Sequence, residues 1–164
     1  MTNPIIHQNL VVKPVGTGEF GIFSKGHFNA YEIIEACAWL PISQRMQILI
    51  AKNSSQLTNH LFSNPDGLNK ERAFLDKLAE LELEKRLDSG LITPAQAQML
   101  MQDIGGPNKL LDITSHAILL GFGSIYRKSQ SPNINWEYDS ESKLYIFSTV
   151  QQVRPGQELT YFSN

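Results

Sequence analysis

Apolar residues form short runs at both ends of the chain and helically spaced stripes in its middle. In residues 1–42, apolar runs at 10–12, 21–23 and 32–40 are separated by turn-forming residues, glycine above all. This texture is typical of short strands joined by tight turns. Residues 113–164 have the same texture, and the segment DSES at 139–142 predicts a hairpin between the apolar segments on either side of it. Both ends of the chain are therefore predicted to be β-structure.

The middle of the chain, residues 43–112, has the spacing of helices. One apolar stripe recurs at three- and four-residue steps and ends near Ser89-Gly90. A second helix is expected to begin at Thr93, with Pro94 in its first turn and Gln96 completing a capping box. Its stripe is expected to stop at Gly105-Gly106. The stripe residues are Phe74, Leu75, Leu78 and Leu81 in the first helix and Ala97, Leu100, Met101 and Ile104 in the second.

Earlier helical turns are expected around Met46, Leu49 and Ile50, and again around Leu57 and Leu61. The whole pattern predicts a single domain over residues 1–164, mainly β, with a helical insert at 43–112. A chain of 164 residues is long enough for one hydrophobic core of its own.

Composition and charge exclude several classes of partner. The formal net charge of -2 provides no basic field for nucleic acid, so no nucleic-acid partner is predicted. No apolar run approaches the roughly 20 residues of a membrane span, and the N-terminus lacks the pattern of a signal peptide. With Cys37 as its single cysteine, the chain is predicted to be a soluble, cytoplasmic protein of a reducing compartment.

The residue types that most often carry chemistry are isolated in this sequence. Cys37 lies in an apolar run without a flanking signature, so core packing is favoured over a nucleophilic role. The four histidines have no histidine or cysteine partner at metal-ligand spacing, and no metal site is predicted. They are His7, His27, His60 and His116.

Two glycine-bearing segments are the candidates for a site. GTGEFGIF, at 16–23, would let the backbone approach a ligand closely, although a simple β-turn needs the same glycines. It is not a dinucleotide fingerprint, because a strand rather than a helix follows it. GFGSIYRKSQSPN, at 121–133, carries Arg127 and Lys128 side by side, and could be a site, a lost site or a solvated turn.

Taken in order, these segments resemble the SET-domain protein-lysine methyltransferases of the compact bacterial or viral type. The resemblance rests on GIFSKGHFNAYEIIEACAWLPI, LLGFGSIYRKSQSPNINWEY and GQELTYF, and it covers residues 15–42 and 115–162. It implies a β-clip fold of small sheets with a threaded C-terminal segment and a helical insertion. It also implies S-adenosylmethionine as cofactor and a protein or peptide bearing lysine as substrate.

The resemblance implies a cofactor site with departures from the family pattern. The family has an Asn-His-Ser turn where this chain has Arg127, Lys128 and Ser129, whereas Pro132 and Asn133 match. Lysine can supply the same backbone groups as histidine, but arginine is a permanent cation that would repel the ammonium of the cofactor or pair with its carboxylate. A carboxylate could screen that repulsion, and Glu19 is one candidate. The implied cofactor-binding residues are Gly18, Glu19, Phe20, Gly21, Arg127, Lys128 and Ser129.

The family's catalytic tyrosine corresponds to Ser163 in this chain. Tyr161 is the nearest substitute and is the candidate catalytic residue, although its position also matches a core aromatic of the family. Tyr126 is the candidate substrate-binding residue. Two alternatives stay open beside the enzyme: a degenerate SET-like module that binds peptides or assembles complexes, and a structural role in which the helical insert forms a homodimer or partner contact.

Overall fold

The computed structural model describes residues 4–53, 60–103 and 112–162. The chain divides into two compact units. The first, here called the β unit, joins Met1–Leu40 to Ile118–Asn164, and the second, the helical unit, is Pro41–Ala117. The predicted insert at 43–112 falls inside the helical unit, and the assignment of the whole chain to a single domain stays a prediction.

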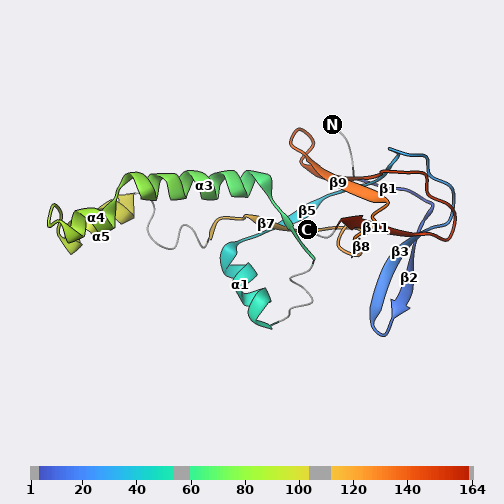
Figure 1. Ribbon diagram of the computed structural model, residues 1–164, viewed down its shortest axis with the longest axis horizontal. Helices are drawn as coiled ribbons and strands as arrows, with labels where there is room; N and C mark the ends of the chain where they lie inside the picture. The colour runs from blue at the N-terminus through green and yellow to red at the C-terminus, as the bar shows by residue number, and fades with distance from the viewer. Residues whose placement is uncertain (1–3, 54–59, 104–111, 163–164) are drawn as a thin grey trace. The chain divides into compact units, whose positions relative to one another are not determined.

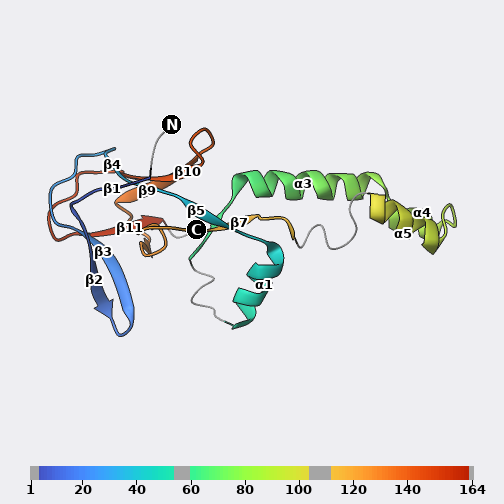
Figure 2. The same ribbon diagram turned by 180° about the vertical axis from the view of Figure 1, so that it is seen from behind.

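The first sheet of the β unit has the strand order β1-β4-β10-β9, all antiparallel. Its hairpin of β9 and β10 turns at residues 140–143, as the DSES segment predicts. Strand β10 lies between β4 and β9 in this sheet (Figure 2). The side chains of Tyr145 and Phe147 on this strand are completely buried. The strands are β1 (Ile5–Ile6), β4 (Ile33–Cys37), β9 (Ile134–Asp139) and β10 (Leu144–Thr149).

The second sheet of the β unit has the order β2-β3-β11-β8. β2 and β3 form a hairpin (Figure 1) whose turn contains Gly18 at φ 77°, a backbone angle that suits glycine. β11 runs antiparallel to β3 and parallel to β8. The C-terminal strand therefore lies between two segments that are far apart in the sequence. The strands are β2 (Leu10–Gly16), β3 (Glu19–Ser24), β8 (Arg127–Ser129) and β11 (Glu158–Phe162).

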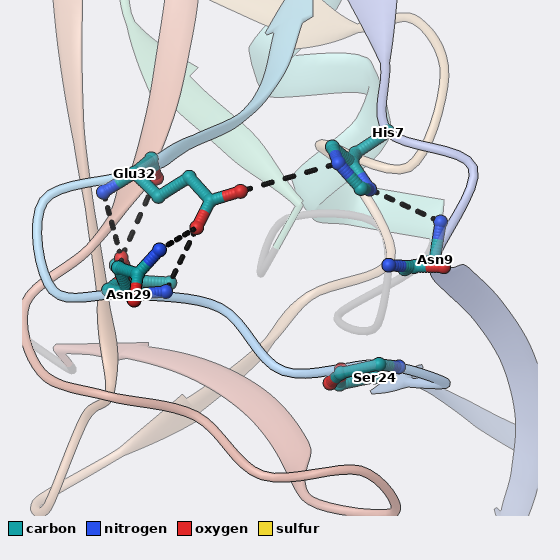
Figure 3. A network of polar contacts seen from close by, with 7 residues as sticks. His7, Asn9, Ser24, Asn29 and Glu32 are labelled. Carbon is teal, nitrogen blue, oxygen red and sulfur yellow. Dashed lines mark hydrogen bonds and ion pairs between the residues drawn. The ribbon is translucent and has the colours of Figure 1, made fainter.

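A polar network holds the loop that leads from β3 to β4 (Figure 3). Glu32 Oε2 accepts a hydrogen bond from the Asn29 amide at 2.8 Å, and Glu32 Oε1 lies 4.0 Å from His7 Nε2. His7 Nδ1 in turn accepts a bond from the Asn9 amide at 3.1 Å. The buried Thr149 hydroxyl accepts from the Glu32 amide and donates to the Asn29 carbonyl. These bonds fix the start of β4.

The helical unit contains four described helices, which lie in the segments where the apolar spacing predicts helical structure. The capping box at Thr93 is confirmed, since the Thr93 amide donates to Gln96 Oε1 at 2.9 Å and the Gln96 amide donates to Thr93 Oγ1 at 3.3 Å. The stripe from Phe74 to Leu81 does not form one helix to Asp88, because Glu82 at φ 43° interrupts it. The helices are α1 (Gln44–Asn53), α3 (Pro65–Glu80), α4 (Leu83–Asp88) and α5 (Pro94–Asp103).

The expectation of helical turns around Leu57 and Leu61 is wrong at Leu61, which begins strand β6 (Leu61–Ser63). A short apolar run fits a strand as well as a helix, and pairing with β7 decides for the strand. Leu57, Ile104 and Gly105-Gly106 lie outside the described residues.

A third, small sheet has the order β5-β7-β6. β5 (Trp39–Ile42) and β7 (His116–Leu119) each contain a boundary between the two units, so the chain leaves and re-enters the β unit through them. The expected fold class, mainly β with a helical insertion, is confirmed. Among the described residues, no helix is long and apolar enough to cross a bilayer.

Candidate active site

The second sheet brings the two candidate segments of the sequence together. β11 pairs with β3 through Glu158 opposite Phe23, and with β8 through Thr160 opposite Arg127 and Tyr161 opposite Lys128. The glycine-bearing hairpin and the Arg127 segment thus lie on either side of one strand. β11 therefore joins the two candidate segments in one sheet.

A buried asparagine fixes β11 in this place. The Asn133 amide group donates to the Glu158 carbonyl at 2.7 Å, and its Oδ1 accepts from the Thr160 amide at 2.9 Å. The backbone of Asn133 also donates to the Thr160 carbonyl at 3.0 Å. Asn133 is 9% exposed, so these bonds are shielded from water. The sequence identified Asn133 only as a match to the family pattern, whereas the structure shows that it clamps the strand.

The residues of the glycine hairpin differ in what they contribute. Gly18 lies in the turn, and the side chains of Glu19 and Phe20 are exposed. Gly21 is buried, and a side chain there would overlap the carboxylate of Glu158 and approach Val15 Cγ1 to 3.1 Å. Glycine at position 21 therefore leaves room for the Glu158 side chain beside the hairpin.

Arg127 lies between two carboxylates. Its Nη1 is 3.4 Å from Glu158 Oε1, and its Nη2 is 4.0 Å from Glu19 Oε2. The Arg127 side chain is 45% exposed and that of Glu158 is 25% exposed, so solvent weakens these attractions. These three side chains together carry one net negative charge.

The other two residues of β8 are less constrained. Lys128 is exposed, while Ser129 is partly buried and its Oγ accepts a hydrogen bond from the Ser131 amide at 3.1 Å. That bond shapes the turn after β8. The cofactor-binding role implied for these residues by the resemblance stays a prediction.

Both candidate tyrosines are buried. Tyr161 is 6% exposed, and burial raises its pKa to about 12. Tyr126 is 2% exposed, and its ring lies 4.8 Å from that of Phe147. The structure places both rings in the interior of the β unit, and their catalytic and substrate-binding roles stay predictions. Ser163 lies outside the described residues.

Sequence reasoning missed a buried carboxyl group in β4 that bonds the turn before the Arg127 segment. Glu35 in β4 is completely buried, and its Oε1 accepts a hydrogen bond from the Phe122 amide at 2.7 Å. Burial raises the pKa of Glu35, and the neighbouring Cys37 thiol, Tyr126 hydroxyl and backbone amides oppose that effect. The signal in the sequence is a single acidic residue inside the apolar run IIEACAWL.

The candidate site contains charged oxygen and nitrogen groups. Such groups suit a small ligand that carries both a positive and a negative charge. Glu19, Glu158 and Arg127 offer both signs of charge within a few ångströms. Among the described parts of the chain, no group of three or more histidine, cysteine or acidic residues could hold a metal ion.

No protein-family model matches the sequence, and no curated protein matches it either. Solved structures do match it. A candidate histone methyltransferase of Plasmodium falciparum aligns over 97% of this chain and 96% of its own, with 15% identity and a TM-score of 0.52. Arabidopsis thaliana SUVH6 in complex with SAM aligns over 96% of this chain and 28% of its own, with 15% identity and a TM-score of 0.50.

The Neurospora SET domain protein DIM-5, a histone lysine methyltransferase, aligns over 88% of this chain and 48% of its own, with 13% identity and a TM-score of 0.47. Identities this low show the fold alone. The alignments with TM-scores of 0.52 and 0.50 therefore show that the chain has the fold of SET-domain proteins, as the sequence predicts. Its membership of the compact bacterial or viral type stays a prediction.

Proposed function

We propose that this chain is an S-adenosylmethionine-dependent protein-lysine N-methyltransferase whose site lies in the β unit. The observation that carries the proposal is the pairing of β11 with both β3 and β8, because it sets Gly21, Arg127 and Tyr161 on adjacent strands of one sheet. SUVH6, which has the same fold, is known in complex with SAM. That complex supports the choice of cofactor.

The charges beside β11 fit the amino-acid end of this cofactor, which carries an ammonium and a carboxylate. Glu19 and Glu158 would attract the ammonium, and Arg127 would offer its forked donors to the carboxylate. The excess of one negative charge offsets the repulsion between Arg127 and the ammonium. Arginine in place of the family's asparagine is therefore compatible with binding.

When bound, S-adenosylmethionine would supply an electrophilic methyl group to the substrate amine. The protein's part would be to align that amine and to keep water away from it. With a pKa of about 12, the Tyr161 hydroxyl stays protonated at neutral pH, so it would act as a hydrogen-bonding group and not as a base. The lysine proton would leave to solvent before transfer.

The proposal is tested by methyl transfer from labelled S-adenosylmethionine to lysine-bearing proteins, read by mass spectrometry. Transfer to lysine by the wild type is the expected result. If Tyr161 aligns the amine, Tyr161→Phe should lower turnover at least about tenfold with little change in cofactor affinity, because the hydroxyl would act mainly in the transition state. Tyr31→Phe is the matched control, since Tyr31 is 81% exposed. No transfer to any lysine, or transfer to another residue type, would contradict the proposal.

A second candidate function is a catalytically degenerate SET-like module that binds a peptide or assembles a complex. It is favoured by Arg127 and Lys128 in place of the family's Asn-His, and by the ion pair of Arg127 with Glu158. A cofactor at about 100 times its dissociation constant stabilises a folded protein by roughly 2.7 kcal/mol. For a chain of this size, that is a rise of several degrees in melting temperature. A wild type that shows no rise with millimolar S-adenosylhomocysteine would favour the module over the enzyme.

A further inference from the structure

Glu35 is buried in a place where a carboxyl group without hydrogen-bond partners would destabilise the fold. It occupies the middle of the first sheet, opposite Ile6 of β1 and Phe147 of β10, and its side chain is completely buried. An ionised carboxylate in such surroundings requires hydrogen bonds, and a neutral one requires at least a partner for each polar atom. The position would suit an apolar residue if the carboxyl group had no task.

A hydrogen bond of this carboxyl group joins two distant parts of the chain. Glu35 Oε1 accepts from the backbone amide of Phe122, which is 87 residues further along. Glu35 Oε2 and the Tyr126 hydroxyl are both buried and make no hydrogen bond at normal geometry among the described residues. The hydroxyl lies near enough to the carboxyl group to lower its pKa, so a small shift would join them.

The turn at 120–126 is shaped around this carboxyl group. Gly121 has φ 81°, and a side chain there would come within 2.5 Å of Glu35 Oε1. A side chain at Gly123 would come within 2.9 Å of Cys37 Sγ. Both glycines therefore allow the turn to pack closely against β4, where the Phe122 amide meets Glu35.

The turn ends directly at the Arg127 segment. Tyr126 is its last residue, its amide donates to the Phe122 carbonyl at 3.3 Å, and its ring is packed on Phe147. The next residue, Arg127, begins β8. If the Phe122 amide moved, the hydrogen-bonded turn would therefore move β8 as well. The pairing of β8 with β11 would then change.

We infer that Glu35 is a positioning residue, which holds the 120–126 turn through the Phe122 amide and thereby sets the place of Arg127, Lys128 and Ser129. The inference concerns the ligand-free protein, and only its last measurement rests on the proposed function. It assigns a task to a completely buried acid that is not among the candidate cofactor-binding residues.

Amide hydrogen exchange of the ligand-free protein tests the inference. Glu35→Met keeps the size and removes the acceptor, whereas Glu35→Gln keeps a carbonyl acceptor for Phe122. We expect Glu35→Met to raise exchange at the amides of Phe122 and of 127–129 at least about tenfold, and Glu35→Gln to stay within about threefold of the wild type. Thr149→Val is the matched control, because Thr149 is equally buried but bonds the loop at 29–32. It should leave these amides unchanged.

Equal exchange at 127–129 in Glu35→Met and Thr149→Val would overturn the inference, as would Glu35→Gln behaving like Glu35→Met. If Glu35→Met does not fold, the amide proton shift of Phe122 decides instead. It should move in Glu35→Gln, because the chemistry of its acceptor changes, while Thr149→Val leaves it in place, and an unmoved Phe122 signal would refute the assignment.

Binding of S-adenosylhomocysteine provides a separate readout. Glu35→Met should raise the dissociation constant at least about tenfold, and Thr149→Val should change it less than about twofold. Unchanged affinity in Glu35→Met would show that the turn does not position the binding residues. A wild type that does not bind would refute the proposed function, and the exchange measurements would still decide the role of Glu35.

Discussion

The two units of this chain bury their apolar residues to very different degrees. Of the largest fully buried side chains among the described residues, only Asn64 belongs to the helical unit, and the others are in the β unit. Helices α1 and α4 have no buried residue, and α5 has only Ala97. Several large apolar side chains of the helical unit are exposed instead: Met46, Ile48, Leu49, Leu68, Leu75, Leu91 and Met99. The candidate site lies in the unit that has its own dense core.

This difference shows what an amphipathic stripe can and cannot predict. The spacing of Phe74, Leu75, Leu78 and Leu81 predicts a helix, and α3 is one. Among these residues, however, only Phe74 is buried. A stripe thus reports a preference for a helix with one apolar face, while the burial of that face depends on what packs against it.

The largest contrast is expected from truncating one side chain in each unit. Phe147→Ala removes a completely buried ring from the β unit and should lower the free energy of unfolding by about 3–5 kcal/mol. Leu75→Ala, at a residue that is 44% exposed in α3, should change it by less than about 1 kcal/mol. Urea unfolding of both variants measures the two values. Similar losses of unfolding free energy in the two variants would contradict the difference in core packing that the burial of these side chains indicates.

The next largest effect is expected at the clamp of β11. Asn133→Ala would leave the Glu158 carbonyl and the Thr160 amide without their side-chain partner, which should cost about 2–3 kcal/mol of unfolding free energy. It should also abolish the rise in melting temperature with S-adenosylhomocysteine, because β11 would lose its fixed place beside β8. The control is Asn53→Ala in the helical unit, where the amide group donates to the Leu49 carbonyl on an exposed surface.

Local features of the fold could be predicted because their signals are local. The turn at Gly18, the hairpin at 140–143 and the capping box at Thr93 each need only a few adjacent residues, and all three are present. The break at Glu82 carries no such signal, and the run at Leu61 is too short to separate a strand from a helix. Those two elements could not be predicted from spacing.

The candidate site was predictable in part, and only through order along the chain. The resemblance placed Glu19 and Arg127 in one site, and the structure brings their charged groups to 4.0 Å. Local patterns do not encode the parallel pairing of β11 with β8 that makes this possible. The bond from Phe122 to Glu35 spans 87 residues, so the role of that acid could not be derived from its neighbours in sequence.

A smaller effect is expected from the pH dependence of Glu35. Its folded-state pKa is raised by burial above the unfolded value of about 4.3, so the unfolded chain releases this proton first as the pH increases. The contribution of Glu35 to stability is thus complete below the unfolded pKa and is lost as pH rises to the folded pKa, at up to about 1.4 kcal/mol per pH unit. The facing groups, Cys37 and Tyr126, also have raised pKa values and stay neutral in this range.

Glu35→Gln should therefore gain stability relative to the wild type as the pH rises from about 4.5. Unfolding free energies of both proteins at several pH values up to 8 measure the difference. Parallel curves for the two proteins would show that the carboxyl group titrates alike in the folded and unfolded chains.

The smallest effect on stability, and the most informative for the site, is expected from Arg127→Asn. Its ion pairs are half exposed, so the unfolding free energy should change by less than about 1 kcal/mol.

The response to S-adenosylhomocysteine distinguishes two roles for this arginine. If Arg127 pairs with the ligand's carboxylate, Arg127→Asn should weaken binding several-fold and reduce the rise in melting temperature. If it opposes the ammonium, the same change should strengthen binding, since it removes a like charge and supplies an acceptor. Glu158→Gln should then act in the opposite direction, because it removes a charge that attracts the ammonium. A third outcome is a wild type that does not respond and a variant Arg127→Asn that does. It would show that the arginine alone prevents binding at a site whose other residues are still in place.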